Sequence, residues 1–329
     1  MNQLHRIALG VSLLSAAAAL AQAPASAPST NYPVKPVRVI VGFAAGGGID
    51  GIARFYAQRF SEALHQSFVI ENRPGAGGNI GTEFVAKAPP DGYTLLMTSV
   101  VHTISGSLYA KLPFDAVKDF APISTVALTP NCIAVHPSIP VKTLRELVAL
   151  AKAMPGEISY ASAGNGSPQH VGMELFRSMA GITLQHIPYN GASPSTIAVL
   201  GGQIPVLSTS LPAALPHARA GKLRVLAVTT AKRTELAADY PTVAEAASLP
   251  GFEAVVWYGL LAPAGTPPAA INKLNVEIER LQQSREIRER LAALAYDPYR
   301  HTPAGFADLI RTDVVKWGKV IREAGAKVD

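Results

Sequence analysis

A run of three glycines stands between a short apolar segment and a helix-like pattern near the start of the chain. The apolar segment covers residues 37–43, and apolar side chains recur with a helical period from Ile49 onwards. Glycine lets the backbone turn tightly and approach a ligand closely. The first turn of the following helix presents unpaired N–H groups and a partial positive charge, which suit an anion. The ligand-binding residues expected here are Phe43, Ala44, Ala45, Gly46, Gly47, Gly48 and Asp50.

Two other interpretations fit this first loop. Asp50 can cap the helix, and the glycines can form a plain tight turn. Gly46, Gly48 and Gly51 also satisfy the G-x-G-x-x-G pattern of dinucleotide-binding proteins, and Glu71 follows at the distance which that pattern asks for. However, the carboxylate at position 50 opposes a pyrophosphate, and position 52 lacks the lysine that a P-loop needs. We therefore favour a small anion over a nucleotide.

A second glycine-containing loop occupies the same kind of place, between a predicted strand over 158–161 and a helix that extends through residue 179. Ser167 is suited to cap this helix and Pro168 to its first turn. If the two loops face each other, they hold an anion from both sides; otherwise the second loop is only a capped helix start. His170 can donate to a ligand or pack inside the protein. The binding residues expected here are Ser162, Ala163, Gly164, Asn165, Gly166, Ser167 and His170.

No catalytic or metal-binding pattern accompanies these loops. The histidines show no paired metal spacing, and the sequence contains no G-x-S-x-G nucleophile elbow. The single cysteine, Cys132, lies in an apolar segment, so we expect it to be a small buried side chain. A third glycine-rich segment, residues 72–81, lacks the last glycine of a nucleotide loop, and we assign it to the lining of a cleft. We predict no catalytic residue, no metal and no cofactor.

Strand-like and helix-like segments alternate along most of the chain, which is typical of parallel sheets with helices on both faces. A second such unit starts near residue 137, and the helical segments after residue 269 have no strands of their own. If those helices pack on the first unit, the chain crosses between the units twice. We therefore predict an α/β clamshell of two domains, each a mostly parallel sheet flanked by helices. The predicted domains are residues 33–133 with 254–329, and residues 134–253.

The first 23 residues have the parts of a secretory signal peptide: a positive start, an apolar core and small residues at the cleavage position. Residues 24–32 are rich in proline, alanine and serine and are expected to form a flexible leader. The net charge of +6 comes from scattered basic residues, which argues against nucleic acid as a partner. We predict an exported monomer.

A collinear series of motifs runs along the chain, at residues 32–33, 46–50, 71–81, 90–95, 118–122, 162–167, 186–189, 200–203, 241–246 and 261–267. In these motifs the sequence resembles the periplasmic receptors of tripartite tricarboxylate transporters, the Bug-type solute-binding proteins, over essentially its whole length. It implies a type II periplasmic-binding fold, a periplasmic location, a small organic carboxylate as ligand, no enzyme activity and inner-membrane transporter subunits as partners.

The resemblance also implies roles for single residues. The two glycine loops would grip the ligand carboxylate, and Ser99, His102, Tyr189 and Thr209 would line or border the rest of the cleft. Relatives often carry acidic residues near positions 196–198 and 208–209, where this chain has none. We therefore expect a neutral or acidic ligand tail rather than an amine.

A different function class also fits the sequence. A sensory module that presents its liganded form to a membrane kinase would use the same closed cleft as a transport receptor. A periplasmic hydrolase or lyase would need an assembled nucleophile, base and orienting group, which the motifs do not supply.

Overall fold

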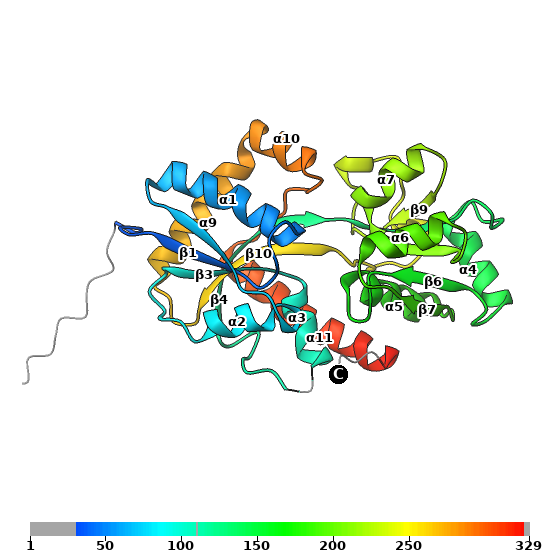
Figure 1. Cartoon of the computed structure of the whole chain (residues 1–329), viewed down its shortest axis with the longest axis horizontal. Coiled ribbons are helices and arrows are strands. Elements are labelled where there is room, and N and C mark those ends of the chain that lie inside the picture. Colours follow the sequence, from blue (N-terminus) through cyan, green and yellow to red (C-terminus); the bar gives the residue numbers. More distant parts are fainter. Residues whose placement is uncertain (1–30, 110, 326–329) are drawn as a thin grey trace, which may run out of the picture.

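The computed structural model describes residues 31–109 and 111–325, which form two lobes, each built on a five-stranded sheet (Figure 1). The order is β2-β1-β3-β10-β4 in the first sheet and β7-β6-β8-β5-β9 in the second. The strands of the first sheet are β1 (Val37–Val41), β2 (Phe68–Asn72), β3 (Thr94–Ser99), β4 (Phe120–Thr129) and β10 (Val256–Pro263). Those of the second are β5 (Asn131–Val135), β6 (Ser159–Ser162), β7 (Gln185–Pro188), β8 (Val206–Ser210) and β9 (Arg224–Val228).

In each sheet one strand opposes the direction of the others. Strands β1, β2 and β3 are parallel, and β10 is antiparallel to both β3 and β4. In the second sheet β6, β7 and β8 are parallel, and β5 is antiparallel to both β8 and β9. Four of the five strands in each sheet therefore share a direction, which confirms the predicted mostly parallel sheets.

Helices cover both faces of each sheet (Figure 1). In the first lobe, α1 (Gly48–Leu64) and α9 (Pro268–Gln283) lie on one face with α10 (Arg285–Ala293) against α9, while α2 (Asn79–Ala86), α3 (Val101–Leu108) and α11 (Pro303–Ala324) lie on the other. In the second lobe, α6 (Ala192–Leu200) and α7 (Leu211–Arg219) face α4 (Leu144–Ala153), α5 (Pro168–Ala180) and α8 (Val243–Ala247) across the sheet. Two short 3-10 turns, Ala76–Gly78 and Glu235–Ala237, complete the elements.

Helix starts follow local sequence signals. Thr143 and Glu146 form a capping box before α4. At α5 the Ser167 hydroxyl accepts a hydrogen bond from the His170 N–H, and Pro168 occupies the first turn, as predicted. Helix α1 differs, because its N-cap is Gly47 and no side chain caps it. The first-turn N–H groups of α1 are therefore left for other partners.

The chain passes between the lobes at two adjacent places. Only Pro130 separates β4 from β5. On the return passage, the Ala254 N–H donates to the Thr229 carbonyl at 2.8 Å, and the Thr229 N–H donates to the Asn131 carbonyl at 2.9 Å. The two crossings are therefore hydrogen-bonded to each other. Because β5 begins at Asn131 and pairs wholly within the second sheet, the first crossing lies three residues before the expected boundary after residue 133.

Sequence patterns missed several elements and placed the end of the leader too late. The helices α3 and α8 and the long strand β4 are among those that were not predicted. Tyr32, assigned to the flexible leader, is 8 % exposed, and its hydroxyl donates to the Gly92 carbonyl at 2.7 Å. Its ring packs edge-on against Tyr93, so the ordered chain starts before residue 33. The predicted signal peptide lies outside the described residues.

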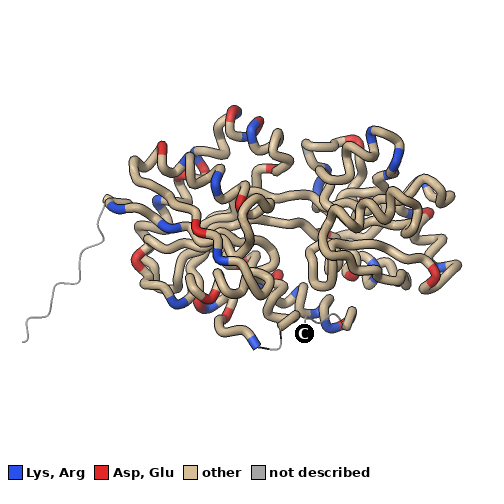
Figure 2. Tube along the Cα trace, in the orientation of Figure 1, with Lys and Arg blue, Asp and Glu red and all other residues tan. Residues whose placement is uncertain are grey.

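Cys132 is fully buried in the apolar cluster of the second lobe, as expected, and burial raises the pKa of its thiol to about 12. Charged side chains of both signs are scattered over both lobes (Figure 2). In the part of the chain that the structure describes, no helix combines the length and the apolar character needed to cross a membrane.

Candidate functional site

A pocket of about 290 Å³ lies between the two lobes, where the crossings run. Its first-lobe lining is Gly48, Thr129, Val256, Tyr258, Leu294, Ala295 and Tyr296, and its second-lobe lining is Asn131, Pro168, Gln169, Ser210 and Pro212. This lining contains hydroxyls, amides and apolar groups but no charged side chain. Any charge on a bound molecule must therefore be balanced by backbone groups and neutral side chains.

Three helix N-termini meet at this pocket. Gly48 begins α1, Pro168 begins α5, and Ser210 is the N-cap of α7. Each terminus carries about half a positive charge. Helix α1 also presents unpaired N–H groups, whereas α5 and α7 have fewer, because the His170 N–H donates to the Ser167 hydroxyl, the Leu211 N–H donates to the Pro130 carbonyl, and each helix has a proline in its first turn. An anion in this pocket would thus be attracted from both lobes without a lysine or arginine.

The first loop is held by Asp50, which is 3 % exposed. One carboxylate oxygen accepts hydrogen bonds from the Gly46 N–H and the Arg54 Nε, both at 2.9 Å. The other oxygen accepts from the Asn72 Nδ2 at 2.9 Å, and the same amide donates to the Phe43 carbonyl at 2.9 Å. These bonds, with that from Arg54 the largest, lower the pKa of Asp50 to about 2. Asp50 does not line the pocket, and its side chain does not cap α1, whose N-cap residue is Gly47. The role of Asp50 is therefore to fix the shape of the loop.

The backbone N–H groups of the first loop that Asp50 does not bind are free to bind a ligand. Residues 44–48 are exposed, and none of the described residues accepts a hydrogen bond from the N–H of Gly47, Gly48 or Ile49. Gly48 faces two tyrosines of the same lobe: the Tyr296 hydroxyl donates to its carbonyl at 2.8 Å, and a side chain at position 48 would meet the Tyr258 hydroxyl at 3.2 Å. Glycine is therefore needed at position 48 for close packing.

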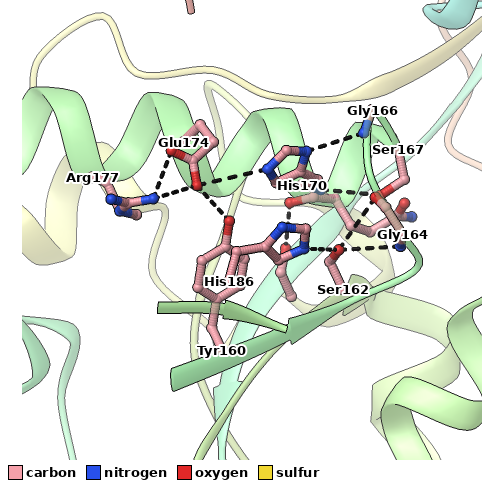
Figure 3. Close-up of polar contacts among 11 residues, drawn as sticks. Tyr160, Ser162, Gly164, Gly166, Ser167, His170, Glu174, Arg177 and His186 are labelled. Carbon is pink, nitrogen blue, oxygen red and sulfur yellow. Dashed lines mark hydrogen bonds and ion pairs between the residues drawn. The ribbon is translucent and has the colours of Figure 1, made fainter. Parts of the chain in front are cut away.

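The second loop is held from beneath by histidines (Figure 3). The Gly166 N–H donates to His170 Nδ1 at 3.0 Å, and the Gly164 N–H donates to the Ser162 hydroxyl at 3.2 Å. Ser162 is also 2.7 Å from His186 Nε2. A side chain at Gly166 would collide with Leu108 of α3 at 2.5 Å, so this loop touches the first lobe. The pocket itself is lined by Pro168 and Gln169, which directly follow the loop, rather than by residues 162–167.

Ser99 and His102, both predicted to line the cleft, are buried in the first lobe at 2 % exposure each. The His102 ring stacks against Phe114, and its Nε2 lies 2.9 Å from the Ala116 carbonyl. Burial lowers the pKa of His102 to about 4. These two residues are not among those that line the pocket, although His102 borders a narrow recess behind Phe43. Tyr189 lies beside the second loop, because its N–H donates to the Ser162 carbonyl at 3.2 Å.

Thr209, which was expected to line the cleft, is not among the residues that line the pocket. Thr209 is fully buried, and its hydroxyl has no hydrogen-bond partner among the described residues. Side chains alternate between the two faces of a strand, so Thr209 shares the inner face with Leu207, while Ser210 lies on the other face and lines the pocket. Ser210, at the end of the same strand, is therefore the residue of this segment whose side chain faces the pocket.

Of the residues that line the pocket, only Gly48 is among the predicted site residues, and the polar side chains that were missed include Asn131, Gln169, Tyr258 and Tyr296. The Gln169 amide lies 3.3 Å from the Asn131 side-chain oxygen, so these two link the pocket's second-lobe wall. Tyr258 and Tyr296 pack edge-on with ring centroids 5.4 Å apart. Position 169 was adjacent to a predicted loop, but no pattern connects the tyrosines with a glycine more than 200 residues earlier.

The dinucleotide interpretation of the first loop finds no support in the geometry. Glu71, which would have met a ribose, accepts hydrogen bonds from Arg38 and Arg73 instead. The third glycine-rich segment packs against the first loop: a side chain at Gly42 would meet the Gly78 carbonyl at 2.6 Å. Within residues 31–109 and 111–325, no group of histidines, cysteines and carboxylates is arranged to hold a metal ion.

The chain is similar to a group of bacterial proteins. The profile of the family described as "Tripartite tricarboxylate transporter family receptor" matches residues 52–326. Protein BugT of Bordetella pertussis is 36% identical over 330 residues, covering 100% of both chains.

Solved structures show the same likeness. The R. palustris protein Rpa4515, determined with adipate, is 35% identical with a TM-score of 0.75, covering 90% of this chain and 100% of that one. MatC from Rhodopseudomonas palustris, determined with bound malate, is 31% identical with a TM-score of 0.71, covering 88% of this chain and 100% of that one.

Proposed function

Because the chain belongs to the tripartite tricarboxylate transporter receptor family, we propose that it binds a small carboxylate-bearing solute between its lobes and delivers it to a membrane transporter. The family comprises solute-binding receptors rather than enzymes, which confirms the prediction that the chain is not an enzyme. Members of the family are periplasmic binding proteins. Export of this chain through a cleaved signal peptide over residues 1–23 is part of the proposal.

The observation that carries the proposal is the meeting of three helix N-termini at an interlobe pocket without charged side chains. A carboxylate bound there would accept hydrogen bonds from the N–H groups of Gly47 and Gly48 and from the first turn of α5. Hydrogen bonds to a charged acceptor contribute about 1.5–3 kcal/mol each, so a few suffice for tight binding. Lobe closure around the anion would remove competing water.

The size and lining of the pocket limit the ligand. A volume of about 290 Å³ is at the small end of ligand pockets, which span roughly 300–1,000 Å³. Val256, Leu294 and Ala295 provide an apolar wall, and no acidic side chain is present to pair with an amine. Adipate and malate, the compounds in the two solved relatives, are of the expected class. We propose a short mono- or dicarboxylate without an amino group.

Mass spectrometry of gently unfolded protein will identify any co-purified ligand, and calorimetry with a panel of carboxylates and amino acids will rank the candidates. Gly47→Val is the decisive variant, because a Cβ at position 47 would meet only the Ala44 carbonyl, at 3.8 Å. The branched side chain would cover the N–H groups of α1 while leaving the fold intact. We expect affinity to fall at least about 100-fold, the loss of two or more charge-assisted hydrogen bonds.

Gly106→Val is the matched control, because Gly106 lies exposed on α3 with nothing within 4 Å of an added Cβ. Unchanged affinity in Gly47→Val, or stabilisation of the wild-type protein by cationic amino acids alone, would place the site or the ligand class elsewhere. Delivery is tested separately: cells that lack this chain should lose uptake of the identified carboxylate and recover it with wild-type protein but not with Gly47→Val.

A further inference from the structure

Two imidazoles are stacked beneath the second loop, His170 from α5 and His186 from β7 (Figure 3). Their ring centroids are 4.0 Å apart, with 10° between the planes. The Tyr160 ring stacks on the other side of His186, with centroids 4.8 Å apart. His170 is only 4 % exposed, so this stack forms the floor of the loop rather than part of its surface.

Each imidazole is bonded to the loop through one ring nitrogen. His170 Nδ1 accepts the Gly166 N–H at 3.0 Å, so it must carry no hydrogen and cannot accept a proton without losing this bond. The Ser162 hydroxyl accepts the Gly164 N–H and lies 2.7 Å from His186 Nε2, and its own hydrogen can be donated to that nitrogen or to the Gly164 carbonyl, 3.4 Å away. In His⁺ both ring nitrogens are donors. Protonation of His170 would therefore set two N–H groups against each other at Gly166.

The positive charge of a protonated imidazole would not be balanced by the charged groups around the stack, because the nearby carboxylate of Glu174 is already paired with Arg177. Glu174 Oε1 lies 3.8 Å from His170 Nε2, but Arg177 holds both oxygens of this carboxylate at 2.6 and 2.7 Å, and the Tyr160 hydroxyl donates to it at 2.5 Å. From the first lobe, Glu323 of α11 accepts a hydrogen bond from Ser178 rather than facing the rings. Burial, with Arg177 adding to it, lowers the pKa of His170 to about 4, and burial and His170 do the same for His186.

We propose that His170 and His186 are positioning residues that hold the second loop in its ligand-binding shape only while both imidazoles are neutral, so that acidification releases the ligand. The inference rests on the proposed function, since the loop supplies the start of α5 to the pocket. It extends that function by making affinity depend on pH through groups that do not touch the ligand. A loosened loop would also lose its contact with Leu108 and weaken lobe closure.

The test measures adipate binding by calorimetry between about pH 8 and about pH 3.5. For the wild-type protein we expect constant affinity until the pH approaches the pKa of about 4 that His170 and His186 have in the folded protein, and a fall of up to about tenfold per pH unit for each coupled histidine below that point. His170→Asn keeps an acceptor near Nδ1 but cannot be protonated, so its profile should be flatter with near-normal affinity at pH 8. His170→Leu removes the acceptor and should weaken binding about tenfold or more at every pH.

Two further variants make the result decisive. His186→Phe preserves the stack but loses the proton site, and should also flatten the profile. His301→Asn is the matched control, because His301 is a half-buried histidine of the first lobe with a lowered pKa and an Nδ1 contact to Thr125. Its profile should match the wild type. The inference is overturned if His170→Asn and His186→Phe keep the full wild-type pH dependence.

NMR of the ligand-free protein separates this inference from the proposed function. ¹⁵N spectra should show His170 Nδ1 without a proton at neutral pH, and the Gly166 amide should exchange faster with solvent in His170→Leu and in acid. If the wild-type protein binds no carboxylate while the amide behaves as described, the positioning stands and the proposed function fails. A protonated Nδ1 at neutral pH, or an unchanged Gly166 amide, overturns the positioning whatever binds.

Discussion

The two glycine-rich loops stand at equivalent places in the two lobes but are stabilised by opposite chemistry. The first is tied down by the buried Asp50 carboxylate, neutralised by Arg54 and bonded to Asn72. The second rests on two neutral imidazoles and a hydroxyl. The Asp50 carboxylate, with a pKa of about 2, stays charged well below pH 4, whereas the two imidazoles, with a pKa of about 4 each, become charged near that pH. The first loop is therefore a fixed element, and the second is the one that solution conditions can alter.

The largest expected effect comes from removing the anchor of the first loop. Asp50→Ala leaves the Gly46 N–H without its acceptor and removes one acceptor each from the Asn72 amide and the Arg54 guanidinium. We expect the free energy of unfolding to fall by about 3 kcal/mol, with ligand affinity lost as well. Urea unfolding measures this change. A loss below about 1 kcal/mol would mean that the glycines alone define the loop.

Acid should affect the second loop first. The folded-state pKa of His170, about 4, lies below its unfolded value of about 6.5, so the unfolded chain takes up the proton first as pH falls. This contribution to stability is complete above about pH 6.5 and is lost progressively toward pH 4. Between pH 7 and pH 4.5, the free energy of unfolding measured by urea titration should fall by about 2 kcal/mol less in His170→Asn than in the wild-type protein. If the free energy of unfolding depends on pH in the same way in both proteins, proton uptake by His170 is not coupled to unfolding.

Tyr296→Phe probes how the first loop is supported from the end of the chain. The substitution removes only the hydroxyl that donates to the Gly48 carbonyl at 2.8 Å. We expect a loss of about 1 kcal/mol in stability and a several-fold loss of affinity. If affinity is unchanged while stability falls, Tyr296 supports the loop without shaping the pocket.

The smallest effect is expected at Thr209, which lies outside the pocket. Thr209→Val replaces a fully buried hydroxyl that has no partner among the described residues by a methyl group of similar shape. Stability should be unchanged or rise by about 0.5 kcal/mol, with ligand affinity unaltered. Ser210→Ala is the contrasting variant. Because Ser210 lines the pocket, this substitution should weaken ligand binding. Reduced affinity in Thr209→Val would restore it to the site.

The parts of the fold that sequence predicted depend on local signals. Glycines next to a helical period located both loops, and Ser167 with Pro168 marked the start of α5. Helix α3 escaped notice because its sequence, VHTISGSL, mixes polar and apolar residues and is buried on several sides. Such a helix lacks the one-sided apolar stripe on which periodicity depends.

The rest of the site depends on long-range contacts. From the sequence, the side chain of Asp50 could face a ligand, cap a helix or form hydrogen bonds inside the lobe. The last of these is decided by the positions of Asn72 and Arg54, which are known only from the folded structure. Tyr258 reaches Gly48 because β10 returns from the second lobe as the one reversed strand of the first sheet. That return depends on the topology of both lobes together, which no local pattern contains.

The paired crossings limit how the lobes can move. Thr129 and Val256 are partners in the first sheet, and Asn131 and Ala254 are joined through Thr229 one step beyond. Two strands held side by side by backbone hydrogen bonds resist twisting about each other but bend readily together. The pairing therefore favours opening in one direction, and α11 of the first lobe, which packs against α5 of the second, restricts the motion further. A membrane partner that docks across both lobes could sense occupancy from that opening, without contacting the solute.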